Sequence, residues 1–122
     1  MKGLKFINSP QTFIADADFV VHLSGISIKD ELFKQLSVKL EIPEYFGHNW
    51  DALSDCLRDF HWIEQRRIIL VHDECPRLDE HELSTYLQVL FEAVQDWKEG
   101  EEHSLEVVFP ESVRSVIEQY CV

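Results

Sequence analysis

Three aspartates at four-residue intervals are the most suggestive chemical feature of this sequence. Asp51, Asp55 and Asp59 share one face of a predicted helix, where like charges repel and cost roughly 0.2–0.5 kcal/mol each. Carboxylates on one helix face point the same way, and this arrangement suits binding a cation. It does not suit glycosidase catalysis, in which the two carboxylates face each other across the sugar. The spacing alone also fits a solvated polar face, so the cation-binding interpretation needs further support.

Metal binding and catalysis find less support in the residue pattern. A hard-metal site needs more oxygen ligands and a loop to wrap them, and no D-x-D-x-D-G loop occurs. His72, Cys75 and His81 form the only His/Cys cluster, and its spacing lacks the second close pair of a zinc site. The phosphate-loop, dinucleotide and nucleophile-elbow motifs are absent, and no nucleophile–base pair can be named. We therefore predict a protein that is not an enzyme and that needs no metal or cofactor.

The net charge of −12 favours a basic protein as the partner. Residues 41–60 carry five acids and one base, and residues 73–102 carry ten acids and two bases, so these two segments hold all of the net charge. A strong field of one sign accelerates encounter with a basic protein. Nucleic acid is a poor partner, because phosphate binding needs Lys and Arg. The clustering predicts one acidic surface if the two segments lie side by side; acidity that only maintains solubility is the competing explanation.

Length and cysteine content set the broad class. The 122 residues fit one domain, 1–122, and the 45% hydrophobic content suffices for a core without disulfides. No stretch approaches the roughly 18 apolar residues of a membrane helix, and residues 1–13 lack the apolar region of a signal peptide. Cys56, Cys75 and Cys121 are odd in number and fit free thiols. We expect a cytoplasmic protein with no membrane contact.

Alternating strands and helices should position the acidic residues. Short apolar runs rich in β-branched residues predict strands, and apolar side chains at helical spacing predict helices. Strands joined by helices pair in parallel through right-handed crossovers. The expected fold is α/β, with a small three-stranded parallel sheet packed with helices, a candidate extra N-terminal strand and a C-terminal helix. The expected strands are 19–23, 68–71 and 105–109 with 4–7 as the added edge, and the expected helices are 28–41, 49–60, 79–98 and part of 111–122.

The segment Ile42–Leu57, IPEYFGHNWDALSDCL, resembles the barstar family very closely. The family pattern is roughly L-P-x-Y-[YF]-G-x-N-x-D-A-L-x-D-x-L, and this chain meets nearly every fixed position. A second match, LQVLFEA at residues 87–93, falls on the longest predicted helix. The resemblance covers about residues 19–109 and leaves the first 18 and the last dozen residues as additions. It implies a barstar-like fold and a stoichiometric inhibitor of a basic ribonuclease, monomeric when free and forming a 1:1 complex.

The resemblance also implies which residues bind the partner. In such proteins the second helix and the loop before it plug the nuclease active site. Asp55 would stand where a substrate phosphate would, and Glu92 would add an acidic contact from the neighbouring helix. An immunity protein against a ribonuclease toxin fits equally well, and a non-catalytic binding module for another basic protein or a metal is the alternative. The implied partner-binding residues are Tyr45, Gly47, Asn49, Trp50, Asp51, Ala52, Ser54, Asp55, Arg58, Phe60, Val89, Glu92 and Asp96.

Two residues depart from the family within this surface, and a third adds bulk to it. Ser54 stands between the two aspartates where the family has an aromatic residue, and Phe60 closes the helix where a tryptophan is usual. Trp50 places a bulky ring just before Asp51. We therefore expect an altered contact surface and a partner that need not be a secreted barnase-like enzyme.

Overall fold

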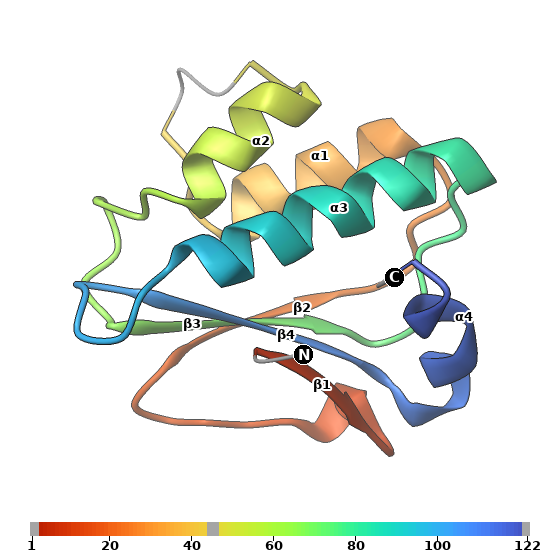
Figure 1. Ribbon diagram of the computed structural model, residues 1–122, viewed down its shortest axis with the longest axis horizontal. Helices are drawn as coiled ribbons and strands as arrows, with labels where there is room; N and C mark the ends of the chain where they lie inside the picture. The colour runs from red at the N-terminus through yellow and green to blue at the C-terminus, as the bar shows by residue number, and fades with distance from the viewer. Residues whose placement is uncertain (1–2, 44–46, 121–122) are drawn as a thin grey trace.

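Four parallel strands form a single sheet, in the order β1-β4-β3-β2 (Figure 1). The computed structural model describes residues 3–43 and 47–120, so Tyr45 and Cys121 of the sequence analysis lie outside the described residues. The α/β fold class and the parallel pairing are confirmed, and the candidate edge strand is the fourth member of the sheet. The strands are β1 (Leu4–Ile7), β2 (Phe19–Leu23), β3 (Arg67–His72) and β4 (Ser104–Pro110).

The two central strands are apolar on both faces because both faces are covered. Residues 68–72 of β3 are fully buried, as are Val107, Val108 and Phe109 of β4. Continuous apolar runs of this kind are typical of parallel strands with cover on each side. Strand β1 pairs with β4, with Leu4 opposite Val107. The expected strand 105–109 is longer in the structure, where β4 includes Pro110 as its last residue.

Three helices lie on one face of the sheet, and the main core fills the space between them (Figure 1). None of the helices in the described part of the chain is long and apolar enough to cross a membrane. A fourth, short helix follows β4 after a single 3-10 turn. The helices are α1 (Lys29–Lys39), α2 (Trp50–Leu57), α3 (Glu80–Asp96) and α4 (Arg114–Glu118).

Helix α2 is shorter than its apolar stripe predicts. The helix ends at Leu57, with Arg58 as its C-cap, and Phe60 adopts a positive φ of 54° that turns the chain away from the helix. A positive φ is rare outside glycine and does not continue a helix. Asp59 therefore lies beyond α2, and the prediction of three aspartates on one helical face is wrong for this residue.

Residues 8–18 cover the other face of the sheet. Phe13 and Ala15 of this segment pack against a second buried cluster of Ile69, Val71 and Val108. His22 Nδ1 lies 2.8 Å from a carboxylate oxygen of Asp73, and its Nε2 donates to the backbone oxygen of Phe13 at 3.0 Å. Residues 4–18 thus complete the sheet and its second hydrophobic cluster.

Candidate functional site

The sequence around α2 starts the helix sharply and holds its aspartates outward. Asn49 is the N-cap, and its side-chain oxygen accepts a hydrogen bond of 2.8 Å from the backbone N–H of Ala52. Leu53 and Leu57 are fully buried on the opposite side of the helix. Asp51, in the first turn, is favoured there by the helix dipole. Asp55 follows one turn later with 81% of its side chain exposed.

Helices α2 and α3 lie side by side and run in the same direction. The ring of Trp50, at the start of α2, lies 6.2 Å from the ring of Tyr86, and Trp97 Nε1 donates to Leu57 O at 2.8 Å at the other end. This contact places the two acidic segments side by side, which is the condition under which their clustered charge predicts one acidic surface. The exposed carboxylates of Asp51, Asp55, Glu92 and Asp96, two on each helix, are called the acidic face below.

Arg58 is the one base among the sequence-predicted site residues, and it lies across the acidic face. Its guanidinium is 3.6 Å from Asp55 Oδ1 and 4.0 Å from Asp96 Oδ2, so it spans the two helices. Its Nε also donates to the backbone oxygen of Ser54 at 3.3 Å. With 42% of its side chain exposed, Arg58 is open to solvent where it meets both carboxylates.

An aromatic cluster beneath this end of α2 fixes its position. Phe60 is fully buried and stacks on Trp97, with ring centroids 6.0 Å apart and planes 10° apart, while His103 meets it edge-on. Trp62 donates its Nε1–H to the backbone oxygen of Leu40, the C-cap of α1. Phe60, a predicted partner-binding residue, therefore lies in the core, where its side chain offers no surface to a partner.

A second anchor holds the other end of α2. Trp50 is half-buried between Phe33 of α1, at 4.9 Å between ring centroids, and Tyr86 of α3. Tyr86 in turn donates to His72 Nε2 at 2.7 Å, because His72 Nδ1 donates to the backbone oxygen of Val108 at 3.1 Å. The bulky ring before Asp51 thus serves mainly to join α2 to the core.

Burial sets the protonation of the groups beneath the acidic face. It lowers the pKa of His72 to about 4, which leaves the imidazole neutral at pH 7. Burial also raises the pKa of Tyr86 well above its usual value. The pKa of the Cys56 thiol is raised by burial first and then by the charges of Asp59 and Asp55. A thiol held in its protonated form is a poor nucleophile.

The remaining predicted site residues surround this surface. Gly47 and Asn49 are exposed, Ala52 and Ser54 are half-buried, and Val89 is nearly buried at 9% exposure. A Cβ added to Gly47 would lie 3.0 Å from Asn49 Nδ2, so glycine there leaves room for the helix cap. Within residues 3–43 and 47–120, no group of three or more His, Cys, Asp or Glu could hold a metal ion.

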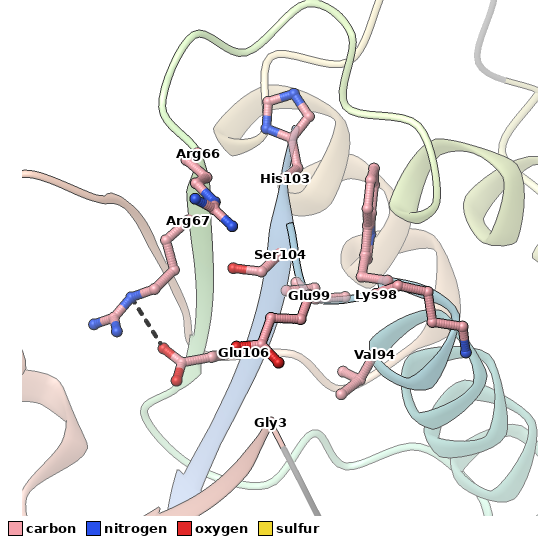
Figure 2. A pocket seen from close by; sticks show the side chains of 11 residues that line it. Gly3, Arg66, Arg67, Val94, Lys98, Glu99, His103, Ser104 and Glu106 are labelled. Atoms are coloured by element: carbon pink, nitrogen blue, oxygen red, sulfur yellow. Dashed lines mark ion pairs between the residues drawn. The ribbon is translucent and has the colours of Figure 1, made fainter. Parts of the chain in front are cut away.

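A cavity of about 260 Å³ lies at the carboxyl end of α3, beside the amino ends of β3 and β4 (Figure 2). Its volume is just below the roughly 300 Å³ at which small-molecule pockets begin. Its charges have both signs, and Arg67 already pairs with Glu106 at 3.2 Å and with Asp18 at 3.0 Å. The cavity therefore offers no clear ligand chemistry. It is lined by Gly3, Arg66, Arg67, Val94, Trp97, Lys98, Glu99, His103, Ser104, Leu105 and Glu106.

A family model described as Barstar (barnase inhibitor) matches residues 17–110, which is 94 of the 122 residues. The match includes β2, β3, β4, the three helices over the sheet and the whole acidic face. Strand β1, most of the segment that covers the second face, and helix α4 lie outside it.

Proposed function

The chain belongs to the barstar family, whose description is that of barnase inhibitors, and from this premise we propose that it inhibits a barnase-type ribonuclease stoichiometrically. In this proposal one copy binds one enzyme molecule and covers its active site with the acidic face. The protein carries out no reaction itself and acts in the cytoplasm as an immunity protein. Cys56 and Cys75, the cysteines in the described part of the chain, are free thiols, in keeping with a reducing compartment.

The observation that carries the proposal is the convergence of four exposed carboxylates from two adjacent helices. A ribonuclease active site must be basic, because it binds the phosphates of RNA. Carboxylates form strong, directional hydrogen bonds with guanidinium groups when water is excluded. An acidic face is therefore complementary to that site. Asp55, with 81% of its side chain exposed against 59% for Asp96, stands at the centre of this face in the proposal.

The anchoring of α2 supports an inhibitor that binds without rearranging. The N-cap and the Trp50 ring hold the start of the helix, and the Trp97–Leu57 hydrogen bond holds its end. A surface already fixed in its bound geometry loses less conformational entropy on association. High affinity can then come from few contacts.

Ser54 is proposed to direct specificity within the family. Its small, half-buried side chain stands where an aromatic residue is usual, so the acidic face is less apolar between Asp51 and Asp55. A partner that fits this surface would need to fill the vacated space with a larger side chain of its own. We therefore expect Ser54→Trp to tighten binding to barnase and to weaken binding to a cognate enzyme shaped to Ser54.

The proposal is tested by titrating this protein into barnase while RNA cleavage is followed. Cleavage should fall linearly and end at one inhibitor per enzyme, and Asp55→Ala should require a large excess. Glu102→Ala is the matched control, since it removes one exposed carboxylate outside α2 and α3 and should behave like the parent. Undiminished cleavage with the parent in excess at micromolar concentration would contradict the proposal.

A further inference from the structure

Arg58 is an unusual presence on a surface that must attract cations. Residues 41–60 contain five acids, and Arg58 is their only base. Its guanidinium lies 3.6 Å from a carboxylate oxygen of Asp55 and 4.0 Å from one of Asp96. In the free protein it therefore occupies the space between two carboxylates that belong to different helices.

We infer that Arg58 is an internal counter-cation that a ribonuclease must displace, a role that rests on the proposed function. The enzyme would offer its own guanidinium and ammonium groups to Asp55 and Asp96. Arg58 already presents the same chemical group to these oxygens. Binding then exchanges an internal ion pair for an intermolecular one, and the affinity depends on how firmly Arg58 is held.

The geometry allows this exchange without unfolding the helix. The contacts of Arg58 with the carboxylates are longer than the 2.7–2.9 Å of a strong charge-assisted hydrogen bond. The side chain is 42% exposed, and the Nε of its guanidinium donates to Ser54 O, which keeps the group near the end of α2 through one of its three nitrogens. Exposed ion pairs of this kind are weak, so their loss changes affinity by a small factor.

The contacts of Arg58 with the two carboxylates also stabilise the free protein. Asp55 and Asp96 face each other across the helix contact, and Arg58 offsets the repulsion between like charges that this creates. The same cation that relieves repulsion before binding competes with the enzyme during binding. Arg58 would thereby favour an enzyme whose cations can outcompete one guanidinium and would disfavour weakly basic proteins, which makes it a specificity determinant.

The test compares Arg58→Gln with Lys98→Gln in binding to barnase. Both changes remove one positive charge, but within the described part of the chain Lys98 Nζ donates only to the backbone oxygen of Gln95, so Lys98→Gln controls for the change in net charge. At about 0.1 M salt, where the Debye length is about 10 Å, Arg58→Gln should bind roughly two- to fivefold more tightly than Lys98→Gln. At about 1 M salt the gain of Lys98→Gln should vanish, and part of the gain of Arg58→Gln should remain.

Carboxyl-carbon NMR resonances of the free protein give a readout that needs no partner. Those of Asp55 and Asp96 should shift in Arg58→Gln and stay near the parent values in Lys98→Gln. Equal affinities of the two variants, or unchanged carboxyl resonances, would overturn the inference while the parent still binds barnase. Failure of the parent itself to bind barnase would instead refute the proposed function, and the displacement role with it.

Discussion

Asp55 combines high exposure with a central place between two anchored helix ends. Its carboxylate has no short hydrogen bond to the protein among the described residues, and its nearest cation, Arg58, is 3.6 Å away. Because the carboxylate of Asp55 makes only weak contacts within the protein, it is available to bind a partner. Truncating it in a complex would lose its own bonds and leave the partner's cations buried and unpaired.

We therefore predict that Asp55→Ala weakens binding to barnase by at least about 2 kcal/mol, or roughly thirtyfold. Its free energy of unfolding should stay within about 0.5 kcal/mol of the parent, as for ordinary surface changes. Calorimetric titration and urea unfolding measure the two quantities, with Glu102→Ala as the charge-matched control. A variant that binds as tightly as the parent would move the contact surface elsewhere.

Because His72 is buried in its neutral form, the free energy of unfolding should depend on pH and fall in acid. Its pKa is about 4 in the folded protein and near 6.5 when unfolded, so the unfolded state binds a proton first as pH falls. As pH falls, protonation of His72 in the unfolded state should lower the free energy of unfolding by about 1.4 kcal/mol per pH unit. Between pH 6.5 and 4 the total loss is about 3 kcal/mol. Above pH 6.5 the contribution is constant. Denaturant unfolding at several pH values should show this slope in the parent and lose it in His72→Gln, and identical slopes would refute the assignment.

At the residue scale, sequence could identify the acidic groups but not their surroundings. Spacing and charge placed Asp51, Asp55 and the α3 carboxylates in two segments, and these segments do meet. The inward turn of Trp50 and the burial of Phe60 depend on rings from α1 and α3 that are distant in sequence. Such packing partners leave no local signal, so both residues were expected at the contact surface.

At the element scale, α2 depends on its capping residue more than on its length. Eight residues are too few for a helix to be stable alone, so the cap and the packing must support it. We predict that Asn49→Ala lowers the free energy of unfolding by about 1 kcal/mol, since it removes the acceptor for Ala52 N–H.

The matched control for this prediction is Asn49→Asp, which retains the acceptor and should stay near the parent. Thermal or urea unfolding of the three proteins measures the difference. Equal losses in both variants would mean that the amide group, through its 3.3 Å bond to Gly47 O, matters more than the cap.

The positions of helices and strands were predictable where apolar runs were continuous. The residues at which they begin and end were harder to predict. Strand β2 has the predicted bounds, and β3, β4, α1 and α3 differ from prediction by a few residues. The early end of α2 follows from a positive φ at Phe60, which an aromatic residue rarely adopts. Phe60 is fully buried there and stacks on Trp97, a tertiary contact that no sequence pattern reveals.

At the scale of the whole molecule, the segment outside the family match completes the fold. Residues 4–16 provide β1 and the part of the chain that buries Ile69, Val71 and Val108 on the second face of the sheet. The sequence predicted Leu4–Ile7 as a candidate edge strand, but the resemblance, which began near residue 19, made this segment look like an addition.

We predict that deleting residues 1–16 lowers the free energy of unfolding by on the order of 5 kcal/mol, because three fully buried side chains become exposed and β4 becomes an edge strand. Denaturant unfolding measures the loss. Should the shortened chain be insoluble, Phe13→Ala gives a milder test with an expected loss of about 2 kcal/mol. A shortened chain as stable as the parent would show that the second hydrophobic cluster contributes little.

The strand order has a consequence for when the protein can act. Strand β4 lies between β1 and β3, yet it is the last strand of the chain to be synthesised. At about 5–20 residues per second, the ribosome needs roughly 5–20 s to pass from β1 to the end of β4. During that time no four-stranded sheet exists to support α2 and α3. The support for α2 and α3, and with it the acidic face, is therefore complete only after almost the whole chain has been synthesised.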